Sequence, residues 1–167
     1  MTTTLATAAQ VRQVLADVPD PEIPVISIED LGILRDVEVG ADGAITVTVT
    51  PTYSGCPAMD EIRADITTAL RAHGWTDVTI RTVLAPAWTT QWLSEDGRRK
   101  LAEFGIAPPT RGPVTAGPVL VALTRPVCCP LCGSADTEEL SRFASTACKA
   151  LWRCRTCREP FDHFKDH

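Results

Sequence analysis

Two closely spaced pairs of cysteines constrain the fold of this chain more than any other feature. Cys129 and Cys132 form the first pair, Cys154 and Cys157 form the second, and 21 residues separate the pairs. Each pair can form a tight turn, and four thiolates from two such turns can surround a zinc ion tetrahedrally. The roughly 40 residues after position 125 are too few to be held together by apolar burial alone. We therefore predict a small β zinc-ribbon domain over residues 126–167, with these four cysteines as metal ligands.

The residues alone leave alternatives open for this end of the chain. The two pairs could form reducible disulfides, and a four-cysteine site could also hold iron or an iron–sulfur cluster. Cys128 could replace Cys129 as a ligand, although the shorter turn favours Cys129. We interpret Cys148 as a core residue of the ribbon, and His163 and His167 as solvent-exposed residues of the tail.

Composition narrows the class of protein. The formal net charge of −5 over 167 residues argues against a nucleic-acid partner. No apolar run approaches the roughly 18 residues of a membrane helix, so no membrane association is expected. The first residues lack a basic region followed by an apolar segment, so we expect no signal peptide and a cytoplasmic protein. In that reducing compartment, seven cysteines indicate metal binding or redox chemistry rather than disulfides.

The preceding part of the chain has the pattern of a small α+β domain. Residues 33–39 and 44–50 alternate between apolar and polar side chains across a glycine-rich turn, which predicts a β-hairpin. Residues 5–18 and 57–73 have helical periodicity, with Gly74 as the stop of the second helix, and residues 77–84 predict a third strand. We expect a mostly antiparallel sheet with helices on one face. The predicted domains are residues 1–107, a proline-rich linker over residues 108–125, and the ribbon.

Cys56 occupies the turn between the second strand and the following helix. Pro57 follows it at a position typical of a helix start, so free backbone N–H groups and the helix dipole should favour a thiolate at Cys56. The alternative is a small buried cysteine that packs the turn. Asp20 and Glu22 lie in an earlier proline-rich turn, where they could act chemically or serve as capping residues.

The motifs of common enzyme classes are absent from the sequence. It has no glycine-rich phosphate loop, no G-x-S-x-G elbow and no H-E-x-x-H motif, and no histidine lies near Cys56. We therefore assign no catalytic residue and do not expect the chain to be catalytic by itself.

Several motifs in one order resemble a known family. Residues 20–24 (DPEIP), 27–32 (SIEDLG) and 50–57 (TPTYSGCP) resemble the SufT-like family of iron–sulfur assembly factors, over about residues 5–85. Further motifs narrow the resemblance to the PaaD family of bacterial phenylacetyl-CoA epoxidase systems, over nearly the whole chain: PAWTTQW at 86–92, STACKAL at 145–151 and CREPF at 157–161.

This resemblance implies an accessory or maturation role in aerobic phenylacetate degradation. The chain would assist assembly of iron or an iron–sulfur cluster in the oxygenase or reductase subunit of the epoxidase, and these subunits would be its partners. Our hypothesis is that Cys56 contacts iron or a cluster transiently, helped by Glu22 or Asp20, with a homodimer sharing the Cys56 thiolates as one arrangement. Two alternatives stay open: an accessory subunit present during turnover, and a metal-stapled protein–protein adaptor without chemistry.

Overall fold

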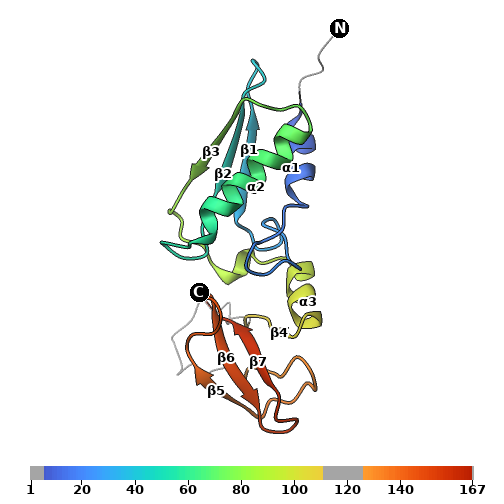
Figure 1. Cartoon of the computed structure of the whole chain (residues 1–167), viewed down its shortest axis with the longest axis vertical. Helices are drawn as coiled ribbons and strands as arrows, with labels where there is room; N and C mark the ends of the chain where they lie inside the picture. Colours follow the sequence, from blue (N-terminus) through green and yellow to red (C-terminus); the bar gives the residue numbers. More distant parts are fainter. Residues whose placement is uncertain (1–5, 111–125, 167) are drawn as a thin grey trace, which may run out of the picture. The chain divides into compact units, whose positions relative to one another are not determined.

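A computed structural model of the chain describes residues 6–110 and 126–166, and it divides into two compact units, Met1–Gly97 and Arg98–His167 (Figure 1). The first unit contains α1 (Ala8–Leu15), β1 (Leu34–Val39), β2 (Ile45–Val49), α2 (Ala58–Ala72), β3 (Val78–Thr82) and the short helix η1 (Thr90–Trp92). The second contains β4 (Ile106–Ala107), β5 (Thr137–Ser141), β6 (Lys149–Cys154) and β7 (Pro160–Phe164). The division falls inside α3 (Glu95–Glu103).

The first unit is the predicted α+β domain. β1 and β2 form the expected antiparallel hairpin, whereas β3 pairs with β2 in parallel, giving the order β1-β2-β3. The parallel pairing follows from the connection, since α2 carries the chain back across the sheet between β2 and β3. In β2 the side chains of Ile45, Val47 and Val49 are buried and alternate with half-buried threonines, as the sequence predicts.

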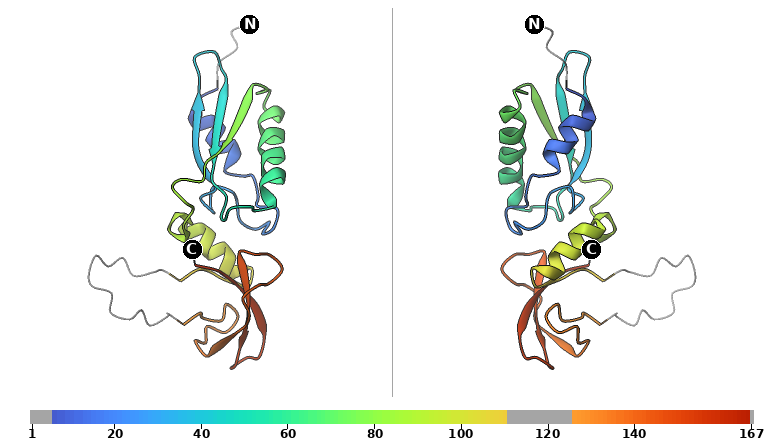
Figure 2. Two further views of the ribbon diagram at one scale, coloured as in Figure 1. Left: turned by 90° about the vertical axis from the view of Figure 1, so that its left-hand side faces the viewer. Right: turned by 90° about the vertical axis from the view of Figure 1, so that its right-hand side faces the viewer.

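Two helices cover this sheet. α1 packs against β1 and α2, and α2 also packs against β3 (Figure 2). Thr7 begins α1 with a capping box in which Thr7 and Gln10 exchange hydrogen bonds. At the end of α2 the amides of His73 and Gly74 donate to Leu70 and Arg71 carbonyls, and Gly74 has a φ of +80°, which confirms the predicted glycine stop.

The second unit is a four-stranded ribbon with the order β4-β7-β6-β5. β5, β6 and β7 are consecutive antiparallel strands, in agreement with the β domain that the sequence predicts. β4 pairs in parallel with β7, so Ile106 and Ala107 belong to this sheet and not to the first unit. The structure therefore divides the chain earlier than the boundary at residue 107 expected from sequence. The sequence does not reveal β4, because a two-residue strand carries too little periodicity to be recognised.

Two further expectations concern the proline-rich linker and the absence of membrane helices. Most of the proposed linker, residues 111–125, lies outside the described residues, and residues 108–110 have no regular secondary structure. None of the helices in the described residues has the length and apolar character needed to cross a membrane.

The packing around Gly32 gives a test of the first unit. Gly32 has a φ of +72°, and a Cβ atom there would lie 2.6 Å from the Cβ of Trp92 and 2.7 Å from its carbonyl oxygen. Gly32→Ala should therefore lower the free energy of unfolding by about 1–2 kcal/mol for the left-handed backbone and by about 1–3 kcal/mol more for the clash. Gly74→Ala is the matched control, since it has a similar φ and nothing within 4 Å of the added atom. Equal losses in urea denaturation of the two variants would contradict the close approach of Trp92.

Candidate functional site

The four predicted metal ligands come together in the second unit. The sulfur atoms of Cys129, Cys132, Cys154 and Cys157 all lie within 4.8 Å of one another. Sγ of Cys129 is 3.8 Å from Sγ of Cys157, and Sγ of Cys132 is 3.5 Å from Sγ of Cys154. A Zn–S bond of about 2.3 Å places tetrahedral ligand sulfurs about 3.8 Å apart. The donor set and its spacing therefore fit a tetrahedral metal ion.

Both cysteine turns are followed by a residue in the left-handed backbone conformation. The residue after the second cysteine of each pair, Gly133 or Arg158, has a positive φ, +76° and +66° respectively. In the first turn the amide of Gly133 donates to the carbonyl of Cys129 at 2.9 Å. The two turns also contact each other, because the hydroxyls of Ser134 and Thr156 lie 2.8 Å apart. The left-handed residue reverses the chain so that both sulfurs of a pair point to one centre.

The electrostatics of the cluster favour a cation. The amide of Cys157 donates to the sulfur of Cys154 at 3.4 Å and lowers the pKa of Cys154 to about 6. The backbone at Glu159 acts on Cys157 in the same direction, but burial and the neighbouring sulfurs outweigh it and raise the pKa of Cys157 to about 12. Four thiols at this spacing therefore ionise in competition with one another. A divalent cation among them would favour the thiolate form of each.

The remaining cysteines and histidines of the ribbon have other positions. Cys128 is exposed and is not part of the cluster, whereas Cys129 is buried within the ribbon core. Cys148 is buried, and its sulfur lies 3.1 Å from the hydroxyl of Thr146, in line with a core role. The expectation for His163 is wrong: only 6% of it is exposed, because β7 places it on the inner face beside Trp152. His167 lies outside the described residues.

A second candidate site lies where β2 ends and α2 begins. The amide of Cys56 donates to the carbonyl of Tyr53 at 3.3 Å, which closes a turn, and Gly55 has a φ of +90° at its third position. Pro57 precedes α2 without a side-chain cap; the amide of Met59 donates to the carbonyl of Cys56 at 3.3 Å, which leaves the amide of Ala58 for another acceptor. The amide of Ala58 and the hydroxyl of Thr52 hydrogen-bond to the sulfur of Cys56. Sequence reasoning misses Thr52, although its place in the TPT motif beside Cys56 is a signal that could have found it.

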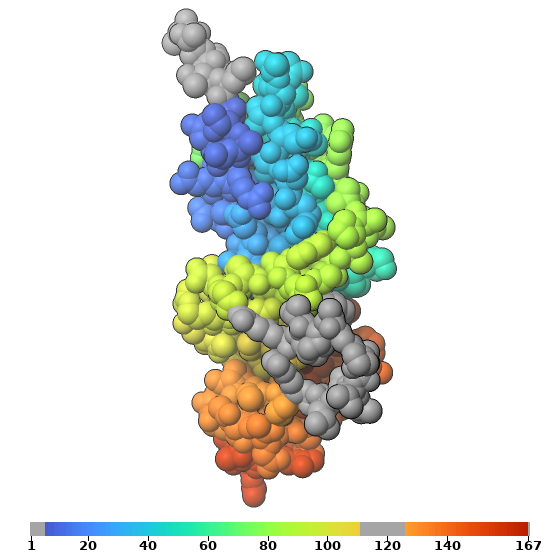
Figure 3. Space-filling view, turned by 180° about the vertical axis from the view of Figure 1, so that it is seen from behind, coloured from blue at the N-terminus to red at the C-terminus, as the bar shows by residue number. Residues whose placement is uncertain are grey.

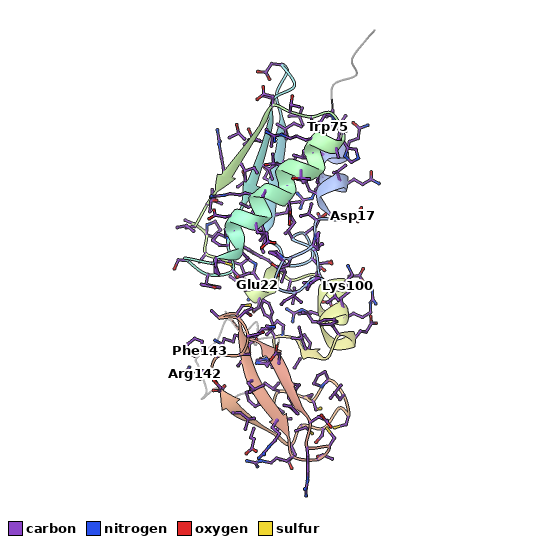
Figure 4. All side chains as sticks on the ribbon, viewed as in Figure 1. Asp17, Glu22, Trp75, Lys100, Arg142 and Phe143 are labelled. Carbon is purple, nitrogen blue, oxygen red and sulfur yellow. The ribbon has the colours of Figure 1, made fainter. Side chains whose placement is uncertain are left out.

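Asp20 and Glu22 lie in a loop at the same end of this unit, and Glu22 is labelled in Figure 4. Oδ1 of Asp20 accepts hydrogen bonds from the amides of Glu22 and Ile23 at 2.9 and 2.8 Å. The loop is also held by the indole Nε1 of Trp88, which donates to the carbonyl of Leu31 at 2.8 Å. Asp20 is thus a buried capping residue, while Glu22 is only half-buried. Both carboxylates lie near enough to Cys56 to affect its ionisation.

The expected acidic thiol at Cys56 is not found. Burial raises the pKa of the Cys56 thiol above its ordinary value; the hydrogen bond from the Ala58 amide lowers it, and the negative charges of Glu22 and Asp20 raise it further. The helix start acts in the predicted direction but is outweighed. Cys56 is therefore a neutral thiol at pH 7 when no cation is near, flanked by two oxygen donors.

Comparison with known proteins places the chain in a family. A family model described as a PaaD zinc beta ribbon domain matches residues 115–165, and one described as an iron–sulfur cluster assembly protein matches residues 8–81. The chain is 47% identical to an Escherichia coli (strain K12) protein that is named as a candidate D component of 1,2-phenylacetyl-CoA epoxidase. The match covers 96% of this chain and 97% of the Escherichia coli protein. The chain belongs to the PaaD family.

Other relatives of this PaaD family member match its first unit. A Porphyromonas gingivalis protein named as an Fe-S protein maturation auxiliary factor is 39% identical over 58% of the chain, which covers 92% of that protein. The crystal structure of a domain of unknown function from Bacillus anthracis matches with a TM-score of 0.53 and 25% sequence identity. The match covers 56% of this chain and 90% of the Bacillus anthracis chain. A conserved hypothetical protein from Thermotoga maritima has a TM-score of 0.51 at 25% identity, covering 60% and 98%.

The two adjacent cysteines of the PaaD ribbon give a matched test of its ligand set. Cys129→Ser should abolish tight metal binding and unfold the second unit, because three thiolates leave the cluster incomplete. Cys128→Ser should leave the metal content unchanged, since that exposed thiol lies outside the cluster. Metal analysis after dialysis, with circular dichroism, would measure both. Loss of metal in the Cys128 variant with retention in the Cys129 variant would reverse the assignment.

The ionisation of Cys56 is measurable in the intact protein. The rate of its alkylation against pH should give an apparent pKa above the value of about 8.5 for a free cysteine, because burial and two carboxylates oppose the thiolate. Glu22→Gln should lower this pKa by removing one negative charge. Glu38→Gln, on the exposed side of β1, is the control and should leave it unchanged. An apparent pKa below that of free cysteine would contradict the description of this turn.

Proposed function

We propose that this chain is an accessory factor that assists assembly of iron or an iron–sulfur cluster in the oxygenase or reductase subunit of a phenylacetyl-CoA epoxidase system. One observation carries the proposal: almost the whole chain resembles a protein named as a component of that epoxidase, and its first unit also resembles an Fe-S protein maturation auxiliary factor. A chain that combines both resemblances has its clients within the epoxidase system.

In this proposal the ribbon holds one zinc ion through Cys129, Cys132, Cys154 and Cys157. Zinc would supply a structural crosslink with a folding free energy on the order of 10 kcal/mol, which a unit of this size needs. The ribbon residues themselves supply the rest: the two left-handed turns orient the sulfurs, and the buried Phe161 closes the apolar side of the cluster. No chemistry is assigned to this site beyond stability and presentation of the surface around it.

Transient contact with the metal cargo is assigned to Cys56. A ferrous ion that binds there displaces the thiol proton, which leaves to solvent or to the Glu22 carboxylate, and a thiolate–iron bond forms. Because the pKa of Cys56 is raised by burial, one proton must be released on binding, and binding should strengthen with rising pH up to that pKa. One sulfur with two nearby carboxylates is an incomplete ligand set that binds iron weakly, which suits transfer of the iron rather than its storage.

A second candidate function is an accessory component that stays in the complex during turnover, and the name of the Escherichia coli relative, as a part of the epoxidase itself, favours it. The two can be separated by maturing the oxygenase and reductase with and without this chain, removing it, and assaying epoxidation. An assembly factor is needed only before purification. A working component must be present in the assay.

The role of Cys56 can be tested in cells. Cys56→Ser should keep the fold and the ribbon metal, because the change is nearly isosteric, yet abolish growth on phenylacetate in a strain that lacks the native protein. Cys128→Ser, a second thiol outside both sites, is the control and should restore growth fully. Full growth with Cys56→Ser at matched protein levels would mean that Cys56 only packs its turn.

A further inference from the structure

A groove of about 800 Å³ lies between α1 and α2 in the first unit, and no residue of the Cys56 turn lines it. Much of its lining is apolar or small, with polar side chains at its rim. Figure 4 labels two of its residues, Asp17 beyond the end of α1 and Trp75 beyond the end of α2. The lining residues in α1 and just after it are Gln10, Gln13, Val14, Asp17, Val18 and Pro19. Those in α2 and just after it are Asp65, Thr68, Ala69, Ala72, His73 and Trp75.

Two carboxylates on this groove lack partners among the described residues. Neither the Asp17 nor the Asp65 side chain makes a hydrogen bond or ion pair within residues 6–110 and 126–166. Asp17 follows the C-terminal end of α1, where the helix dipole is negative and disfavours a second negative charge. Arg12, the basic residue in the last turn of α1, is already paired with Glu29 at 2.7 Å. A cation brought into the groove would relieve this unfavourable placement.

The charge of the whole unit has the same sign. Residues 1–97 contain five basic and 14 acidic residues, a formal net charge of −9, whereas residues 98–167 contain 11 basic and seven acidic residues, a net charge of +4. Such a field attracts cationic partners and disfavours anionic ones. An amphipathic cation fits this lining better than a simple inorganic ion, because an inorganic ion would leave the apolar floor of the groove uncovered.

We propose that this groove binds an amphipathic helix of a partner protein that carries lysine or arginine beside its apolar stripe. The stripe lies over Val14, Ala69 and Ala72, and the basic side chains reach Asp17 and Asp65. Small residues on α2 let a second backbone approach closely. α1, drawn in blue, lies at the surface in Figure 3. This inference does not depend on the proposed function.

The test uses the full chain and a fluorescent helical peptide of about 18 residues made of leucine and lysine, with leucine at positions i, i+3 and i+4. Fluorescence anisotropy would measure its affinity. Asp17→Asn with Asp65→Asn should weaken binding about tenfold, because both charge contacts are lost. Glu38→Gln with Glu61→Gln removes the same net charge from exposed positions outside the groove, and should change affinity less than about twofold.

A third variant separates shape from charge. Ala72→Trp fills the groove at an exposed helix position without altering the charge, and should also weaken binding about tenfold. Equal weakening by the two charge-matched double variants would overturn the proposal and leave only long-range attraction. Equal binding of a peptide with glutamate in place of lysine would overturn it as well. Self-association of the chain that Ala72→Trp abolishes would identify a second copy as the occupant and contradict a separate partner.

Discussion

Four sulfur atoms within 4.8 Å of one another are the constraint on which the second unit depends. The ribbon's apolar cluster is small and includes two of these cysteines, Cys129 and Cys154, together with Phe161 and Val127. Its strands are short, and β4 contributes only two residues. Apolar burial of this extent cannot offset the conformational entropy of the chain, so a metal ion that links the two cysteine turns would decide whether the sheet forms.

The two cysteine sites are opposite in character. In the ribbon, four sulfurs crowd together and Cys154 has a lowered pKa, so a cation there would meet a complete soft donor set. At the Cys56 turn there is one sulfur, its pKa is raised by burial, and its neighbours are carboxylates. A complete tetrahedral site retains its ion, whereas one sulfur competing with a proton releases it readily. This contrast is the physical basis for assigning a structural role to one site and a transfer role to the other.

The features that sequence predicts correctly are those fixed by neighbours along the chain. The cysteine spacing predicts the ribbon cluster, the glycine turn at residues 40–43 predicts the β1–β2 hairpin, and Gly74 marks the end of α2. The errors involve distant residues. The pKa of Cys56 is raised first by burial and further by Glu22 and Asp20, more than 30 positions earlier, and β4 is a strand only because β7 lies beside it. The expectation of an exposed His163 fails because strand alternation near a chain end gives little information about burial.

The most direct test of a maturation role is the metal content of the client. The oxygenase and reductase subunits would be purified from cells that lack this chain and from matched cells that express it, and their iron and cluster content measured by metal analysis and absorbance. We predict that one of the two is present at normal level and folded but deficient in iron or cluster when the chain is absent. Full metal content of both subunits, with epoxidation still dependent on the chain, would contradict a maturation role.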